Sequence, residues 1–177
     1  MQQVLSFWFS ELKPEQWFNG GAELDAQIKQ RFGKLLEQAA AGELCGWRKS
    51  NQGRLAEIIV LDQFSRNVYR DTAQAFAQDA MALVLSQEAV NTGALNELEE
   101  HERDFLLMPY MHSESALIHQ LALPLFEKYA SAGSLKFEIL HKEIIDRFGR
   151  YPHRNAVLER ESSSEELEFL QQPGSGF

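Results

Sequence analysis

Arginine recurs in one spaced pattern, Asp-x-Phe-x-Arg-x-x-x-Arg, which occurs twice in the chain. The two copies consist of Asp62, Phe64, Arg66 and Arg70, and of Asp146, Phe148, Arg150 and Arg154. Together with Arg147, these windows hold half of the arginines and none of the lysines. A guanidinium group binds carboxylates and phosphates through paired hydrogen bonds, and it is equally suited to buried ion pairs. The pattern therefore predicts either an anion-binding site or a structural polar network.

The two windows are predicted to differ in backbone conformation. Asp62, Arg66 and Arg70 are spaced by four residues, so they line one ridge of a helix. In the second window, Gly149 ends a helix and the following Pro152 disfavours helical geometry at the residue before it. The second window then lies on an ordered turn, a common place for ligand contacts. The structural alternative is that Asp62 neutralises Arg66, and that the later arginines bond the carbonyl groups at helix C-termini.

A third polar segment, Pro109-Tyr110-Met111-His112-Ser113-Glu114-Ser115, separates two predicted helices. The imidazole of His112 can act as an acid, a base or a hydrogen-bond donor near neutral pH. Ser113 and Ser115 are interpreted as helix caps rather than nucleophiles, because no Gly-x-Ser-x-Gly elbow is present. Glu114 is a candidate partner for the arginines of the second window. His112 is therefore the candidate catalytic residue if the protein is an enzyme.

Glu138 and His141 have the spacing of a ligand pair from a di-iron helix bundle. Such a bundle needs a second pair and two further carboxylates, and no other histidine follows a glutamate by three residues. We expect no metal and no cofactor, and we expect His141 to pack between helices and to contact the second window. The aromatic residues Phe7, Trp8, Phe9, Trp17 and Phe18 are expected to form a hydrophobic cap.

Helical periodicity extends along almost the whole chain, with no useful β-alternation. It predicts helices over residues 22–41, 52–69, 72–92, 94–108 and 134–148, and from residue 113 onward. Pro109 is expected to end one helix and Pro124 to kink or break the next. Short connections favour antiparallel neighbours. The predicted fold is all-α, with stacked antiparallel helical hairpins or, alternatively, a compact helical bundle. It forms a single domain over residues 1–172, followed by a flexible tail at 173–177.

The composition limits the class of protein. Of 177 residues, 44% are hydrophobic, which supplies an ample core. The net charge of −9 argues against a general nucleic-acid or anionic-membrane binder. Cys45 is the single cysteine, so no intrachain disulfide forms. With no signal-peptide pattern and no apolar run long enough for a membrane span, we expect a soluble, cytoplasmic protein.

These segments together resemble the bacterial domain-of-unknown-function family 924 over nearly the whole chain. The resemblance rests on Phe7-Trp8-Phe9, Trp17-Phe18, residues 61–70 (LDQFSRNVYR), residues 109–114 (PYMHSE) and residues 147–155 (RFGRYPHRN). It implies an all-helical fold related to tetratricopeptide repeats, and it implies no activity. Ser65 stands where the family often has proline.

Three functions remain open at this point. The leading hypothesis is a pocket that binds a small anion or a carboxylate-bearing peptide end. Its predicted lining is Arg66, Asn67, Arg70, His112, Glu114, Arg150, His153, Arg154 and Asn155. The second is an enzyme that acts on an anionic substrate, with His112 as general acid or base and Asp62 or Glu114 orienting it. The third is a protein-interaction module in which every arginine is purely structural. We lean against an enzyme, and the oligomeric state stays open.

Overall fold

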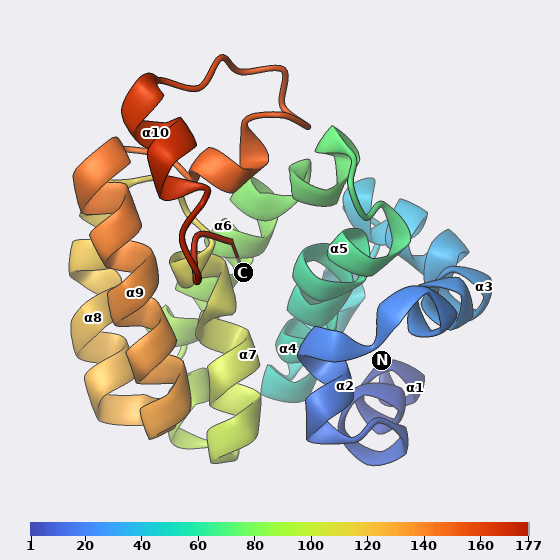
Figure 1. The fold of residues 1–177 in the computed structure, drawn as a ribbon. Helices are drawn as coiled ribbons and strands as arrows, with labels where there is room; N and C mark the ends of the chain where they lie inside the picture. Colours follow the sequence, from blue (N-terminus) through green and yellow to red (C-terminus); the bar gives the residue numbers. More distant parts are fainter. Residues whose placement is uncertain (177) are drawn as a thin grey trace.

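The computed structural model describes residues 1–176, which form helices joined by short turns and contain no β-strand (Figure 1). The all-α prediction is confirmed. The α-helices are α1 (Gln2–Ser6), α2 (Pro14–Asn19), α3 (Gly21–Ala40), α4 (Asn51–Ile59), α5 (Ser65–Val68), α6 (Asp79–Asn91), α7 (Glu100–Met111), α8 (Ala116–Tyr129), α9 (Ala132–Phe148) and α10 (Ser164–Phe169).

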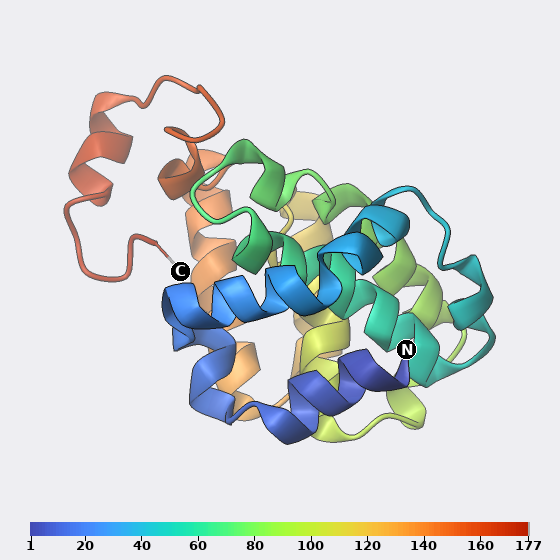
Figure 2. The ribbon, with the colours of Figure 1, turned by 90° about the vertical axis from the view of Figure 1, so that its right-hand side faces the viewer.

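One helical run through the middle of the molecule organises the first half. It consists of α4, the π-helical turn η3 (Val60–Phe64) and α5, and it contacts α1, α3, α6 and α7. Because it is packed on both sides, all residues from Leu55 to Ser65 are buried. Figure 2 shows the N-terminal helices covering one side of the molecule. This arrangement of helices around a central one fits the compact-bundle alternative.

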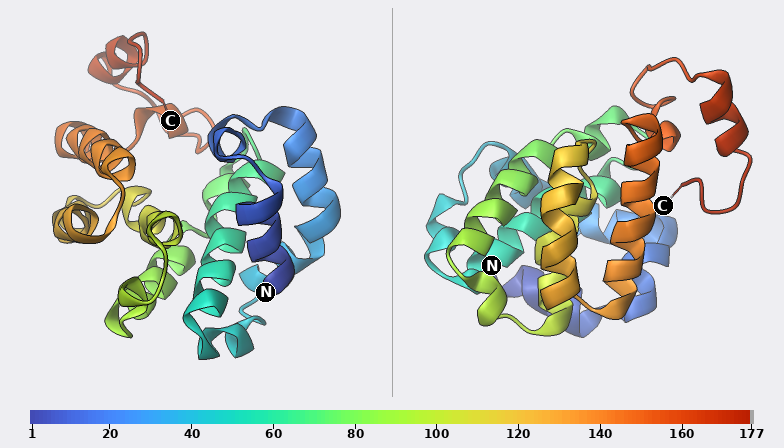
Figure 3. Two further views of the ribbon diagram at one scale, coloured as in Figure 1. Left: turned by 90° about the horizontal axis from the view of Figure 1, so that it is seen from below. Right: turned by 90° about the vertical axis from the view of Figure 1, so that its left-hand side faces the viewer.

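The second half is a succession of helices, α6 to α9, in which each packs on the one before it. Figure 3 shows α8 and α9 lying side by side as an antiparallel pair. The side chain of Ser131 caps α9 by accepting a hydrogen bond from the backbone of Ser134. At the other end of α9, Gly149 adopts a left-handed conformation with φ of 69° and ends the helix as expected. The 3-10 turn η6 (Pro152–Arg154) follows and leads toward α10.

The prediction that Pro109 ends a helix is wrong. Pro124 does not break its helix either, and a kink there stays a prediction. Pro109 lies inside α7 and Pro124 lies inside α8. Pro109 belongs to a stretch from Phe105 to Met111 that is buried throughout, so packing compensates the missing backbone bond. Pro124 and Gln120 are both exposed, so water can bond the Gln120 carbonyl that proline leaves without a partner.

Two helix starts also differ from prediction. Residue 72 precedes only a 3-10 turn, η4 (Ala73–Phe76), and α6 begins later, at Asp79. Similarly, η5 (Ala94–Asn96) stands where a long helix was expected, and α7 begins at Glu100. The predicted capping box of α10 is present, with reciprocal bonds between Ser163 and Glu166.

The core and the chain ends complete the fold. Phe7, Trp8 and Phe64 are fully buried in the main core, whereas Phe18 is exposed. Near the C-terminus, a Cβ atom on Gly176 would lie 3.6 Å from Cβ of His153, so the described chain returns to the second window. The tail prediction includes residue 177, which lies outside the described residues. Across residues 1–176, no helix is long and apolar enough to cross a membrane.

Candidate functional site

Asp62 is a buried carboxylate in the middle of the π-helical turn η3. One of its oxygens lies 2.8 Å from Nδ1 of His112 and 3.1 Å from the Arg66 guanidinium, and the other accepts a 2.6 Å bond from Gln63. Burial alone would raise the pKa of Asp62. The positive charge of Arg66 and the contacts with His112 and Gln63 outweigh it and hold this pKa well below its usual range. Asp62 is therefore ionised in the folded protein.

Arg66 joins Asp62 to a second carboxylate, Asp79, at the start of α6. Two guanidinium nitrogens of Arg66 bond the two oxygens of Asp79, at 2.9 and 3.0 Å. Arg66 also donates to the backbone carbonyl of Asp62 at 2.8 Å. The pKa of Arg66 is raised because its two aspartates outweigh the burial that opposes its charge. Arg66 thus holds both aspartates, through three hydrogen bonds and an ion pair.

Arg154, from the second window, reaches the same carboxylate. Its contact with Asp79 is a single hydrogen bond of 3.2 Å, to an oxygen that already accepts from Arg66. The guanidinium carbon lies 4.5 Å from the ring centroids of both Phe76 and Tyr151. Its Nε is buried and has no hydrogen-bond partner. Burial and the nearby charge of Arg66 lower the pKa of Arg154. Arg154 is therefore the less compensated arginine of the two.

His112 directly follows α7 and contacts Asp62 through one ring nitrogen, Nδ1. Burial and the charge of Arg66 lower the pKa of His112, and the opposing effect of Asp62 is smaller. A neutral ring donates its Nδ1 proton to Asp62, so Nε2 carries a lone pair. Within residues 1–176, no group forms a hydrogen bond with that nitrogen. Asp62 therefore fixes both the tautomer and the direction of the ring.

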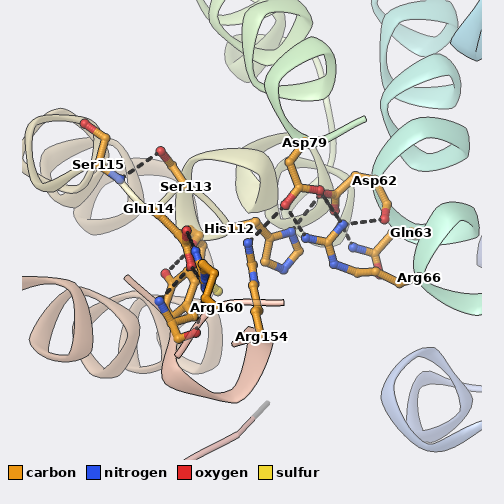
Figure 4. Close-up of polar contacts among 12 residues, drawn as sticks. Asp62, Gln63, Arg66, Asp79, His112, Ser113, Glu114, Ser115, Arg154 and Arg160 are labelled. Carbon is orange, nitrogen blue, oxygen red and sulfur yellow. Dashed lines mark hydrogen bonds and ion pairs between the residues drawn. The ribbon is translucent and has the colours of Figure 1, made fainter. Parts of the chain in front are cut away.

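We call Asp62, Arg66, Asp79, His112 and Arg154 the Asp62 cluster (Figure 4). Two aspartates and two arginines surround the histidine, so acidic and basic side chains are present in equal number. Its members come from η3, α5, α6, α7 and η6, so five separate elements converge on one point.

Buried aromatic and imidazole side chains surround the Asp62 cluster on the side of α8 and α9. The hydroxyl of Tyr151 donates to the carbonyl of Met111 at 2.5 Å and lies 3.2 Å from Nε2 of His119. His119 in turn lies 2.8 Å from Glu138. Burial raises the pKa of Glu138 despite this contact. As predicted, His141 packs between helices and meets the second window, through the ring of Tyr151 at 5.6 Å.

Burial also affects the histidines nearest the Asp62 cluster. It lowers the pKa of His141 to about 3 and that of His153 to about 4. His153 lies beside Arg154 in the chain, and its Nδ1 is buried without a hydrogen-bond partner. Both rings are therefore neutral at physiological pH.

The predicted lining residues divide into those near the Asp62 cluster and those elsewhere. Arg66, His112, His153 and Arg154 come together. Arg70 instead forms two bonds with Asp25, at 2.6 and 2.8 Å, and Asn67 bonds the same carboxylate.

The remaining lining residues take part in contacts around the turn after α9. Arg150 forms paired bonds with Glu166. Glu114 forms paired bonds with Arg160 and accepts from the backbone of Tyr151. Asn155 also bonds Arg160. These contacts hold the turn that carries Arg154, and the charge of Glu114 also acts on Arg154 by opposing the lowering of its pKa.

The sequence interpretation missed Asp79, Phe76 and the role of Tyr151 as an aromatic wall. Asp79 had one available signal, because an acidic residue in the first turn of a helix is favoured by the helix dipole. No signal in the sequence indicated that Asp79 pairs with two arginines. In the described chain, no group of three or more histidine, cysteine, aspartate or glutamate side chains is arranged to hold a metal ion.

Comparison with known proteins adds three findings. The chain is similar over 96% of its length to protein of unknown function ATU0120 from Agrobacterium tumefaciens, with 34% sequence identity, a TM-score of 0.91 and 96% of that chain covered. No protein of curated function matches it. The profile of the family described as "Bacterial protein of unknown function (DUF924)" matches residues 4–174. The chain therefore belongs to this family of bacterial proteins.

Proposed function

We propose that the protein binds a small anion, through a carboxylate or phosphate group, between Arg154 and His112 of the Asp62 cluster. The observation that carries the proposal is the incomplete bonding of Arg154. A guanidinium has five N–H donors, but Arg154 forms only one hydrogen bond, to Asp79. Both oxygens of that carboxylate already accept hydrogen bonds from Arg66. A buried donor without a partner costs about 1–3 kcal/mol. An anionic ligand that accepts from Arg154 recovers that free energy.

His112 determines the protonation state in which the anion binds. A neutral ring held by Asp62 offers a lone pair at Nε2, so it repels an unprotonated anion oxygen. Binding therefore requires either a ligand that brings an acidic proton, such as hydrogen phosphate, or uptake of one proton by His112. Once protonated, the imidazolium is stabilised by Asp62 on one side and by the ligand on the other. The affinity is expected to fall as the pH rises, by up to about tenfold per unit.

Thermal unfolding in the presence of inorganic phosphate, acetate or citrate, at matched ionic strength, tests the proposal. A ligand at about 100 times its Kd stabilises the fold by about 2.7 kcal/mol, or roughly 5–11 °C in Tm for a chain of this size. We expect phosphate to raise the Tm of the wild type, and Arg154→Ala and His112→Asn each to remove that increase.

Arg70→Ala is the matched control, because Arg70 belongs to the same repeated pattern but bonds Asp25 outside the Asp62 cluster. It should keep the response to phosphate. If no anion in a broad panel raises the wild-type Tm, or if Arg154→Ala responds like the wild type, the binding proposal is wrong.

One further observation favours a catalytic use of the same residues. Asp62, His112 and the unbonded Nε2 form the arrangement of an oriented general base, with Arg154 placed to hold an anionic substrate. A screen of phosphate and carboxylate esters tests this second function. Turnover by the wild type that His112→Asn abolishes, and that Arg70→Ala leaves intact, supports it. A screen without any turnover leaves the anion-binding proposal as the function of the site.

A further inference from the structure

The outer face of the α8–α9 pair is unusually apolar. Of the nine large apolar side chains that are exposed within residues 1–176, five lie on these two helices. Leu117 and Leu121 of α8 are 62% and 51% exposed, and Ile139 and Leu140 of α9 are 41% and 36% exposed. A shallow surface hollow on α9 is lined by Leu135, Ile139 and Leu140, among others. Concentrated apolar exposure of this kind marks an interaction surface.

The two helices form a continuous face. They are joined by residues 130–131 and run antiparallel (Figure 3). Residues at equal distance from that turn are level with one another, so Leu121 lies level with Leu140. Both are exposed, so apolar side chains of the two helices lie at matching heights along the outside of the pair.

The charges beside the patch identify its partner. Ala132, Lys136, Ile139 and Glu143 are spaced by four, three and four, so they share the outer stripe of α9. Lys136 and Glu143 are both exposed, and neither forms an ion pair with any described residue. They lie at equal distances on either side of Ile139 and Leu140. When a second α9 is laid antiparallel across the first, with the twofold axis between these two residues, each Lys136 meets the partner's Glu143.

We infer that the outer face of α8 and α9 binds the same face of a second copy of this chain. The stripe is complementary to itself, which is the condition that a twofold interface imposes. Apolar contacts form its centre at Ile139, Leu140 and Leu121. An identical Lys136–Glu143 pair lies at each end of this apolar centre.

The size of the face sets the expected strength. With 14 residues in α8 and 17 in α9, it measures roughly 25 by 20 Å, or about 500 Å² on each copy. The total of about 1,000 Å² lies at the lower limit for specific association, below the ~1,600 Å² of a standard interface. The dimer is therefore expected to dissociate on dilution rather than to be permanent.

Sedimentation velocity of the wild type over roughly a hundredfold range of concentration, with micromolar dissociation expected, tests the inference. Lys136→Glu and Glu143→Lys each place like charges opposite one another, and each should be monomeric throughout that range. An equimolar mixture of the two variants pairs glutamates on one chain with lysines on the other. It should associate as the wild type does, and so should the double variant. Ile139→Asp should be monomeric, while Val84→Asp, at a more exposed apolar position on α6, should dimerise normally.

Each alternative outcome overturns the inference. If the wild type stays monomeric, the patch does not bind a second copy of the chain. Dimerisation that survives both charge variants places the interface elsewhere. If the single variants no longer dimerise and their mixture does not dimerise either, the antiparallel pairing of α9 is excluded. Since all substituted side chains are exposed, circular dichroism of the monomeric variants should match that of the wild type.

Discussion

Replacing Asp62 by Asn removes the buried charge on which the Asp62 cluster is built. Asp62 accepts from His112, Gln63 and Arg66 at 2.8, 2.6 and 3.1 Å. An amide keeps one acceptor and places an NH₂ group against either the Nδ1 proton of His112 or the amide of Gln63. Loss of one partner from a buried ion pair costs about 3–5 kcal/mol. Because Arg66 keeps both of its bonds to Asp79, the lower end of that range, about 3 kcal/mol, is expected.

The measurement is urea unfolding at neutral pH, supported by calorimetry. A loss of about 3 kcal/mol corresponds to a decrease of roughly 6–12 °C in Tm for a chain of this length. Asp25→Asn is the control, because Asp25 also pairs with an arginine of the first window, Arg70, whose side chain is half exposed. That substitution should cost about 1 kcal/mol or less. If both variants lose the same stability, Asp62 does not act as a buried anion.

Acid titration gives an independent check of the same reasoning. The pKa of Asp62 is lower in the folded protein than the ~3.9 of an unfolded chain. Its contribution is therefore fully present above about pH 4 and is lost as the pH falls further. The gap in unfolding free energy between the wild type and Asp62→Asn should be widest at neutral pH and should narrow at about pH 3. A gap that does not change with pH would contradict an ionised Asp62.

Two further predictions concern pH and backbone conformation. Because burial lowers the pKa of His141 to about 3 and of His153 to about 4, the unfolded chain binds more protons below about pH 6.5. Stability should then fall from pH 6.5 toward pH 4, by up to ~1.4 kcal/mol per unit for each histidine, and His153→Gln should reduce the slope in urea unfolding. Gly149→Ala should cost about 1–2 kcal/mol because of its left-handed φ, whereas Gly33→Ala inside α3, where added bulk meets nothing closer than 4.0 Å, should stabilise by up to ~1 kcal/mol in the same assay.

Local patterns predicted the helices better than their ends. The stripe of Leu24, Ile28 and Phe32 identified α3, and the Ser163 capping box identified α10, because both signals depend only on neighbouring residues. Pro109 and Pro124 misled the prediction, because the cost of a missing helix bond depends on burial and solvent contact, which are tertiary properties. The curvature expected of a tetratricopeptide-like stack stays a prediction.

The site was predictable in its residue types but not in its pairings. The arginine pattern and His112 supplied Arg66, Arg154 and His112 of the Asp62 cluster, while Arg70 and Arg150 pair with acids elsewhere. The acids that decide which arginine is available are distant in sequence. Asp25 is separated from Arg70 by 45 positions, and Asp79 is separated from Arg154 by 75. No local spacing rule connects residues so far apart.

The two copies of the arginine pattern show why spacing alone is an incomplete guide. In the first copy the acid, Asp62, is buried and Arg66 beside it enters the site. In the second copy the acid, Asp146, is about half exposed and pairs with Lys142, because it lies on the outer side of α9. The helix then ends at Gly149, so the last arginine, Arg154, turns inward instead of continuing along a helical ridge. The copies are thus alike in sequence and unlike in three dimensions.

Asp79 is the carboxylate that one arginine from each copy of the pattern bonds. Arg70, Arg150 and Arg160 each pair, through two hydrogen bonds, with a carboxylate that no other arginine of the described chain bonds. Arg66 and Arg154 share Asp79, and Arg66 takes the better geometry. When an arginine is the only one that bonds a given carboxylate, its charge is compensated and its role is structural. Arg154 has to share its carboxylate and lies between two aromatic rings, so among the arginines of the Asp62 cluster it is the one that an added anion is proposed to stabilise.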